Sequence, residues 1–277
     1  MNCTTSGAST NSTTFLTFLD NYEMWIFSIN VVFGLPTHSY VLWLIVSGTG
    51  RRVASEIFML NLCCCEIFIC VDFFFFTLSG YIANLLPLAL ILQGVAMTGR
   101  PVFQCLMCVE RYLAVVHPVT FLKYKPLRYR VICCTAAWVI TFGSCLVCLM
   151  IFLLFTFTVH TWFYTLQFLL FLFIQLFCLV AVLRALKQSG PGERGREREE
   201  ENHMKRRAFY LILITTVAMV MTYVPFTIAG FITILAHPYY VSVWCPALFY
   251  VLASFVQPVH YLHQAGKLSC LCSSKNL

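Results

Sequence analysis

Seven long apolar stretches alternate with short polar or charged segments along this chain. They lie at about residues 25–47, 55–79, 83–110, 131–153, 162–185, 207–235 and 241–264. Each is long enough to cross the hydrocarbon core of a bilayer, about 30 Å, as a helix. A helix is the expected form, because a segment in lipid has to satisfy its own backbone hydrogen bonds. The pattern therefore predicts an all-α fold, a seven-transmembrane helix bundle.

Charged separators mark three of the boundaries, and turn residues mark the weaker ones. Basic segments follow the first, third and fifth stretches, at 48–52, 111–130 and 187–207. No charge lies between Asp72 and Arg100, so Ser79-Gly80 and Asn84 to Pro87 are the turn signals there. A second uncharged turn is expected near Thr156 to Thr161. Both of these connections must be very short.

A mixed-charge run, Glu193 to Glu201, lies before the sixth stretch and after Ser189-Gly190-Pro191-Gly192. It is typical of a solvated helix extension or a disordered loop. A surface that docks a partner protein is the alternative.

Composition supports lipid as the solvent for most of the chain. The 277 residues are 60% hydrophobic and 10% charged, whereas soluble domains carry about a quarter charged residues. A soluble enzyme, a nucleic-acid-binding protein and a disordered scaffold are excluded on this ground. Most of the 15 Cys lie inside apolar stretches and are interpreted as small buried hydrophobes.

The basic residues predict the orientation in the membrane. Of the 18 Lys and Arg, all but Arg100 lie in the odd-numbered loops or at the C-terminus. Basic loops face the cytoplasm, so the N-terminus is expected outside and the C-terminus inside. The expected organisation is an extracellular tail (1–24), the helical domain (25–264) and a cytoplasmic tail (265–277). The sequons at Asn2 and Asn11 then lie where glycosylation occurs.

Four motifs occur in the order and at the depths of one receptor family. Glu110-Arg111-Tyr112 closes the third stretch, and Trp138 lies in the fourth. Tyr223-Val224-Pro225-Phe226 lies in the sixth, and Gln257-Pro258-Val259-His260-Tyr261 ends the seventh. Together they resemble the rhodopsin-like G-protein-coupled receptors over about residues 25–272. Gly34-Leu35-Pro36 and Val41-Leu42-Trp43-Leu44 look most like the purinergic and chemoattractant branch.

The resemblance implies a plasma-membrane receptor that binds a small extracellular ligand and activates a heterotrimeric G protein. It implies that a neighbouring carboxylate, Glu110, holds Arg111 until activation frees the guanidinium for the G protein. Pro225 matches the hinge of the sixth helix, where the missing N–H weakens the helix. Residues assigned to coupling and activation on this basis are Glu110, Arg111, Tyr112, Tyr223, Pro225, Pro258 and Tyr261.

Several family positions are altered. His38 replaces the first-helix Asn, Glu66 the second-helix Asp, Tyr223 the aromatic toggle Trp, and Gln257 the seventh-helix Asn. The Cys pair of the family's extracellular disulfide is absent. A Cys3–Cys245 bridge is a possible substitute.

Depth arguments bring four polar residues to the middle of the membrane. At 1.5 Å per residue, Glu66 and Arg100 each lie about 16 Å from the cytoplasmic end of their stretch. His38 and Gln257 reach a similar level. A charge at this depth has to face the bundle and find a partner. We expect Arg100 to pair with Glu66 and to occupy the place where the family holds a sodium ion. Snorkelling of Arg100 to the interface is the alternative.

By the same resemblance, the ligand lies between the outer halves of helices three, five, six and seven. The residues expected to line that pocket are Gln93, Met97, Phe163, Gln167, Tyr223, Phe226 and Val251. They include no charged anchor, so an uncharged or lipophilic ligand and no cofactor are expected. The role of Asp72, a pocket residue or an outer-end cap, is left open.

Beyond the helices, Cys270 and Cys272 follow Lys267 and are candidates for palmitoylation, with free thiols as the alternative. A signalling-silent receptor of the same family is the second hypothesis, since several switch positions are altered. A seven-helix membrane enzyme or transporter is the third. His260 and His263 lie one turn apart, but no third metal ligand is evident. No internal repeat of the transporter kind is found.

Overall fold

The computed structural model describes residues 24–48, 56–124, 127–154, 157–188, 196–235 and 244–264. All regular elements in these ranges are helices. The first three predicted membrane segments contain the elements η1 (Asn30–Gly34), α2 (Leu35–Val46), α4 (Ile57–Ser79), η2 (Ala83–Leu85), α5 (Leu86–Gly94), η3 (Val95–Gly99) and α6 (Arg100–Val116). The remainder comprises α7 (Pro118–Tyr124), α8 (Leu127–Leu154), α9 (Phe157–Gln188), α10 (Arg196–Leu235), α11 (Trp244–Ser254) and α12 (Val256–Gln264).

Six of the segments are long and apolar enough to cross a membrane. They are Met24–Val46, Ile57–Ser79, Leu86–Val116, Leu127–Met150, Thr158–Lys187 and Ala208–Ile232. The seventh predicted stretch is divided at Phe255 into the shorter helices α11 and α12. The prediction of an all-α bundle with seven membrane segments is therefore confirmed.

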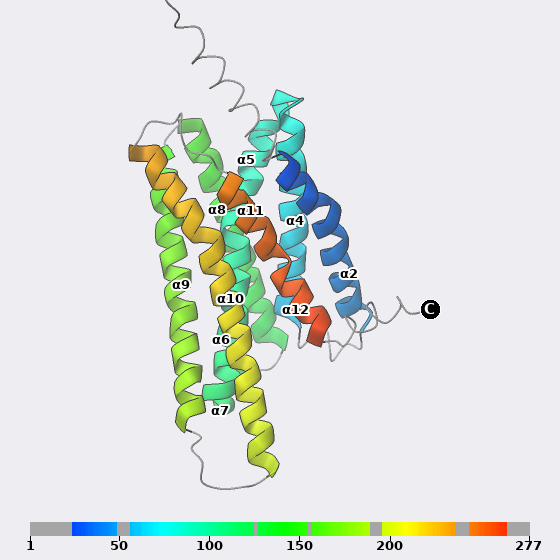
Figure 1. Cartoon of the computed structure of the whole chain (residues 1–277), viewed down its shortest axis with the longest axis vertical. Coiled ribbons are helices and arrows are strands. Elements are labelled where there is room, and N and C mark those ends of the chain that lie inside the picture. Colours follow the sequence, from blue (N-terminus) through cyan, green and yellow to red (C-terminus); the bar gives the residue numbers. More distant parts are fainter. Residues whose placement is uncertain are drawn as a thin grey trace, which may run out of the picture.

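The third segment lies at the centre of the bundle (Figure 1). Its inner half, α6, packs against α4, α8, α9 and α10. Helix α2 packs against α4 on one side, and α9 packs against α10 on the other. The divided seventh segment closes the ring, because α11 contacts α10 and α12 contacts α2. Polar side chains on α4, α6 and α11 consequently meet in the interior.

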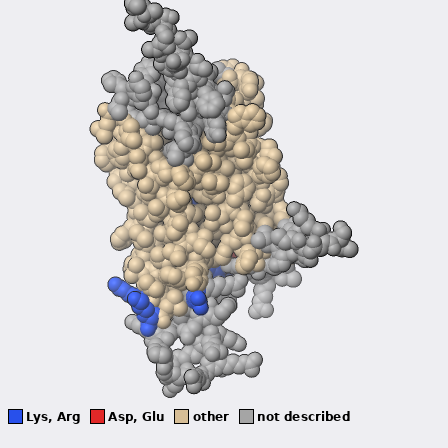
Figure 2. All heavy atoms as spheres, viewed as in Figure 1, with Lys and Arg blue, Asp and Glu red and all other residues tan. Residues whose placement is uncertain are grey.

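The outer surface of the bundle is apolar. Large side chains such as Trp43, Phe142 and Phe173 are more than half exposed, which is unfavourable in water and normal against lipid tails. In Figure 2 the middle of the visible face carries no described basic side chain on its surface, and the blue Lys and Arg atoms gather near one end. This distribution is that of a multi-pass membrane protein.

The two outer turns are short, as predicted. Helix α4 ends at Ser79 and η2 begins at Ala83. Helix α8 ends at Leu154, and α9 already begins at Phe157. The second turn was expected near Thr156 to Thr161, but residues 157–161 already belong to α9.

The mixed-charge run continues into the sixth segment as helix. Helix α10 begins at Arg196 and runs for 40 residues, so the backbone from Arg196 to Glu201 is a helix extension rather than a loop. The residues from Ser189 to Gly195 lie outside the described ranges.

Two π-helical turns interrupt the first and third segments at the same local sequence. Each ends at a Gly that is followed by one residue and then Pro: Gly34-Leu35-Pro36 and Gly99-Arg100-Pro101. Pro has no N–H to donate to the preceding turn, so the backbone there is free to widen. The π-turns shift the faces that the outer halves of these helices present. The hydrophobic pattern did not predict them.

At one position a Gly lets the third and fourth segments approach each other closely. A Cβ atom placed on Gly94 of α5 would lie 2.6 Å from backbone atoms of Cys145 in α8. Only Gly fits at such a crossing, which is typical of membrane helix packing. Most of the cysteines in the helices are buried, as expected, although Cys64 is half-buried and Cys133 is exposed on α8.

Candidate functional site

A guanidinium and a carboxylate form a bidentate pair in the middle of the bundle. Nε of Arg100, at the start of α6, lies 2.6 Å from Oε1 of Glu66 on α4. Nη2 lies 2.7 Å from Oε2 of the same carboxylate. Arg100 is 1% exposed and Glu66 is 3% exposed. The predicted pairing of these two residues is therefore present, and Arg100 does not snorkel towards the interface.

Tyr250 of α11 completes the surroundings of the guanidinium. Nη1 of Arg100 donates a hydrogen bond to the Tyr250 carbonyl oxygen at 3.1 Å. The Arg100 Cζ atom lies 3.8 Å from the centre of the Tyr250 ring. A cation over an aromatic face is attracted to it, the more strongly where water is excluded. The second, third and seventh segments are thus joined through one side chain.

The π-turn η3 provides an acceptor for two further hydrogen bonds. The carbonyl oxygen of Ala96 accepts from the hydroxyl of Tyr250 at 3.0 Å and from that of Tyr223 at 3.2 Å. In a π-turn this carbonyl would receive the N–H of residue 101, which is Pro and has none. Because the carbonyl is free, the third, sixth and seventh segments meet on it. Tyr223 lies where the resemblance placed the aromatic toggle.

The other two members of the predicted polar network lie differently. Nε2 of His38 lies 3.9 Å from Oε2 of Glu66, and neither ring nitrogen has a hydrogen-bond partner within the described ranges. Gln257 is buried, but it lines a different cavity, beside Glu110 and Arg111. The expectation that Gln257 neighbours the pair therefore has no contact to support it. Its depth was counted from Lys267, three residues beyond Gln264, where α12 ends.

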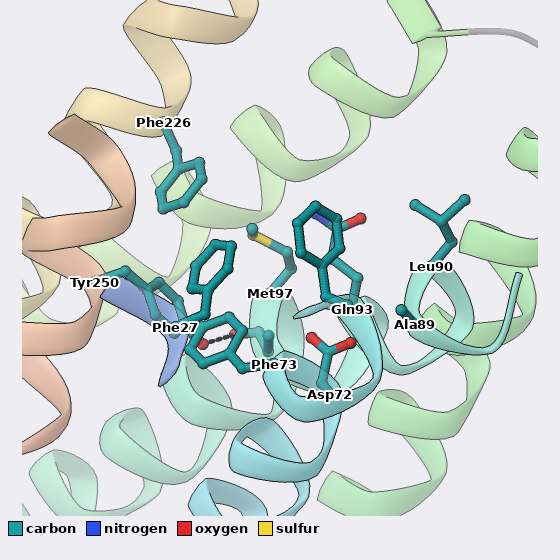
Figure 3. A pocket seen from close by; sticks show the side chains of 11 residues that line it. Phe27, Asp72, Phe73, Ala89, Leu90, Gln93, Met97, Phe226 and Tyr250 are labelled. Atoms are coloured by element: carbon teal, nitrogen blue, oxygen red, sulfur yellow. Dashed lines mark hydrogen bonds between the residues drawn. The ribbon is translucent and has the colours of Figure 1, made fainter. Parts of the chain in front are cut away.

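A cavity of about 170 Å³ opens on the outer side of this cluster. Figure 3 shows the side chains of its wall, which come from the first, second, third, sixth and seventh segments. The lining residues are Phe27, Asp72, Phe73, Phe76, Ala89, Leu90, Gln93, Ala96, Met97, Phe226 and Tyr250. Tyr250 belongs to both the cavity wall and the buried cluster below it.

Three of the predicted pocket residues, Gln93, Met97 and Phe226, line this cavity. Phe163, Gln167, Tyr223 and Val251 do not. The amide of Gln167 instead donates to the hydroxyl of Thr98 at 2.9 Å, which closes the bundle on the side of the fifth segment. Phe163 is 36% exposed on the outside of α9, and Val251 is buried in the core. The cavity is displaced towards the first and second segments as a result.

Asp72 is the residue that the sequence left unassigned and the structure places in the cavity wall. It is only 5% exposed, and in Figure 3 its carboxylate points into the cavity on the side of Gln93. This cavity therefore has a charged residue in its wall, which the set of expected pocket residues did not include. The signal was in the sequence, since Asp72 lies six residues after Glu66, but the first helix was not expected to contribute a wall.

A second cavity, of about 90 Å³, lies at the opposite end of the bundle. Its wall includes Glu56, Glu110, Arg111, Gln257 and Tyr261. The hydroxyl of Tyr261 donates to Oε2 of Glu56 at 2.5 Å. Three residues that the resemblance assigned to activation, Glu110, Arg111 and Tyr261, thus surround one space.

The carboxylate of Glu110 is bound by a different arginine from the one expected. Its Oε1 lies 2.5 Å from Nη2 of Arg130, near the start of α8. Arg111 is exposed, and within the described part of the chain it forms no ion pair. The expected Glu110–Arg111 contact is therefore corrected to Glu110–Arg130. Arg130 reaches Glu110 from α8, and its guanidinium takes the carboxylate oxygen that Arg111 was expected to bind.

The remaining activation residues do not line this second cavity. The hydroxyl of Tyr112 lies 3.0 Å from Nε2 of His117, which follows α6. Pro225 lies inside α10, and Pro258 is buried in α12. Trp138 donates from its indole nitrogen to Oδ1 of Asn61 at 2.8 Å and so fixes α8 against α4.

Several predicted features lie outside the described residues. These are the sequons at Asn2 and Asn11, the tail cysteines Cys270 and Cys272, and Cys3 of the suggested bridge. Among the residues that are described, no group of three or more His, Cys, Asp or Glu side chains could hold a metal ion.

Comparison with known proteins connects this geometry to a family. Residues 38–261 match the family described as 7 transmembrane receptor (rhodopsin family). Hydroxycarboxylic acid receptor 2 of Rattus norvegicus is 26% identical over 224 residues, covering 72% of this chain and 59% of the relative. Chemokine XC receptor 1 of Homo sapiens is 27% identical over 225 residues, with coverage of 75% and 63%. C-C chemokine receptor type 8 of Homo sapiens is 26% identical over 227 residues, with coverage of 73% and 61%. The chain spans about three fifths of the length of these relatives.

Proposed function

Because the chain belongs to the rhodopsin family of seven-transmembrane receptors, we propose that it is a plasma-membrane receptor for a small extracellular ligand. The ligand binds in the outer cavity, and the opposite end of the bundle activates a heterotrimeric G protein. The N-terminus lies outside and the C-terminus in the cytoplasm, since basic side chains gather at the end that holds Arg111.

The observation that carries this proposal is that Tyr250 belongs both to the outer cavity and to the buried cluster around Arg100. Its ring forms part of the outer cavity wall and also covers the guanidinium of Arg100. Its hydroxyl shares the Ala96 carbonyl with Tyr223 of α10. A ligand that displaces Tyr250 therefore changes contacts on the third, sixth and seventh segments together. The three segments can then pack in two alternative ways, and a ligand that binds one packing more tightly shifts the equilibrium towards it.

The cytoplasmic end supplies the group that meets the G protein. Arg111 is exposed at the cytoplasmic cavity, and α10 carries Pro225 in its interior. Movement of α10 away from α6 widens that cavity, so a helical segment of the partner can reach the guanidinium. Arg suits this contact because its charge is permanent and its planar fork can bind backbone carbonyls.

In this scheme Arg130 keeps Glu110 away from Arg111. Arg130→Gln should free the carboxylate to pair with Arg111 and so lower nucleotide exchange on the G protein several-fold, roughly 1 kcal/mol for a pair near the surface. The measurement is basal exchange with purified receptor in lipid vesicles. Adding Glu110→Gln to the same variant should restore exchange. An increase in exchange with Arg130→Gln alone would contradict this scheme and show instead that the Glu110–Arg130 pair holds the inactive state.

The Arg100–Glu66 pair leaves no free carboxylate for a sodium ion at mid-membrane. Replacing sodium chloride with potassium chloride at constant ionic strength should therefore leave the melting temperature of the ligand-free receptor unchanged. Thermal unfolding of the purified protein checks this, with the ionic strength held fixed to exclude general screening. A clear stabilisation by sodium that is lost in Glu66→Gln would show that the ion still enters.

The receptor function is tested by nucleotide exchange on a panel of Gα subunits. Vesicles containing the receptor should accelerate exchange on at least one subunit relative to vesicles without it. Equal exchange across the whole panel, in the presence and absence of receptor, would overturn the proposal. That outcome would favour a signalling-silent receptor, for which the altered switch positions Glu66, Arg100 and Gln257 are the supporting observation.

A further inference from the structure

We propose that the outer cavity selects a small ligand that carries one positive charge, an organic ammonium group bound by Asp72. This inference rests on the receptor function proposed above and specifies its ligand. The groups that carry it are the buried carboxylate and the aromatic walls of the cavity.

Asp72 is a buried acid without a counter-ion. It is 5% exposed, and among the described residues no hydrogen bond or ion pair involves its carboxylate. The sequence supplies no basic partner on this side either, because Arg100 is the only Lys or Arg between Arg52 and Arg111 and none precedes Arg51. Arg100 itself is fully used by Glu66 and by Tyr250. An unpaired carboxylate in such surroundings is costly, and a cationic ligand removes that cost.

The rest of the wall suits an ammonium group. Phe27 stacks on Phe73 with ring centres 4.4 Å apart and meets Phe76 edge to face at 5.3 Å. Tyr250 meets Phe73 at 5.7 Å and Phe226 at 5.9 Å. These five rings form a continuous aromatic surface, and aromatic faces attract cations.

The same wall disfavours the other ligand classes. An organic acid would meet the charge of Asp72 without any basic group to bind it, since Arg100 is not part of the lining. A bare metal ion prefers six or more oxygen ligands, whereas the lining side chains offer oxygens only from Asp72, Gln93 and Tyr250. A volume of about 170 Å³ suits a ligand of about one ring, since a cavity of about 150 Å³ holds benzene.

The inference is tested with three probes of similar size: benzylamine, benzyl alcohol and benzoate. Binding to the purified receptor in lipid nanodiscs is measured directly, without a G protein. Benzylamine should bind at least tenfold more tightly than benzyl alcohol, a difference of about 1.4 kcal/mol, and benzoate should bind most weakly. Equal binding of the amine and the alcohol, or tighter binding of benzoate, would overturn the inference.

Asp72→Asn provides the matched variant, because it keeps the shape of the side chain and removes its charge. Affinity for benzylamine should fall at least tenfold, while affinity for benzyl alcohol should stay within about twofold. The ligand-free protein should be at least as stable as the wild type, since a buried charge is lost. Unchanged affinity for benzylamine in Asp72→Asn would contradict the proposal.

Phe76→Leu is the second variant, and it leaves the carboxylate in place. It should weaken binding of the amine more than binding of the alcohol, since it removes an aromatic face.

Failure of this inference can be distinguished from failure of the receptor function. If benzylamine binds but no Gα subunit responds to the receptor, the receptor function fails and the cation site stands. If Gα subunits respond but the amine does not bind through Asp72, the receptor function stands and the cation site fails.

Discussion

Arg100→Ala will destabilise the receptor by about 3–5 kcal/mol, the usual cost of leaving one partner of a buried ion pair without the other. Glu66 would lose both hydrogen bonds from the guanidinium, and its nearest basic group would be His38, at 3.9 Å. Tyr250 would also lose the cation over its ring and the donor to its carbonyl. We expect a large drop in melting temperature and little folded receptor at the cell surface.

A double variant separates the loss of a partner from the loss of the pair. Glu66→Gln with Arg100→Met replaces both charges by uncharged groups of similar size and should recover most of the stability, as buried pairs often tolerate such replacement. Arg184→Ala, at an exposed position of α9, is the matched control and should have no effect. If Arg100→Ala alone melts like the wild type, the pair is not a structural requirement.

Arg111→Ala will abolish activation of the G protein while leaving the outer cavity intact. Arg111 is exposed at the cytoplasmic cavity and forms no ion pair within the described ranges, so its removal leaves no buried charge. A charge-assisted hydrogen bond contributes roughly 1.5–3 kcal/mol, so we expect nucleotide exchange to fall tenfold or more. Exchange on the responding Gα subunit is the measurement.

The control for this prediction is Arg128→Ala, which removes an exposed arginine at the start of α8 on the same side of the bundle. It should keep exchange near the wild-type rate. Melting temperature and probe binding should be unchanged in both variants, because both positions lie far from the outer cavity. If Arg128→Ala reduces exchange as much as Arg111→Ala, the effect is one of general surface charge.

The fold could be predicted because its main signal is hydrophobicity. Stretches of twenty or more apolar residues define the spans directly, and the basic loops define their order. The Arg100–Glu66 pair followed from the same logic, since a charge in lipid has few alternatives to a partner at equal depth. Helix rise alone was sufficient to bring these two residues together.

The outer cavity could not be derived in the same way. Its position depends on which faces the outer half-helices present, and the π-turns before Pro36 and Pro101 change those faces. A pattern that counts 3.6 residues per turn does not include such turns. Phe163 and Gln167 were assigned to the wall from the family resemblance, and the role of Asp72 was left open between a pocket residue and an outer-end cap. The pairing of Glu110 with Arg130 was also missed, because it joins residues of different helices by side-chain reach.

The short outer turn after α4 also bears on how the chain enters the membrane during synthesis. Arg100 in the third segment would be costly to insert alone, by about 2.5–3.5 kcal/mol on translocon scales. The second segment, with Glu66, is made first, and only the residues between Ser79 and Leu86 separate the two. Insertion of both segments together as a helical hairpin pairs the charges before either meets lipid alone. We therefore expect the Arg100–Glu66 contact to couple the insertion of the second and third spans.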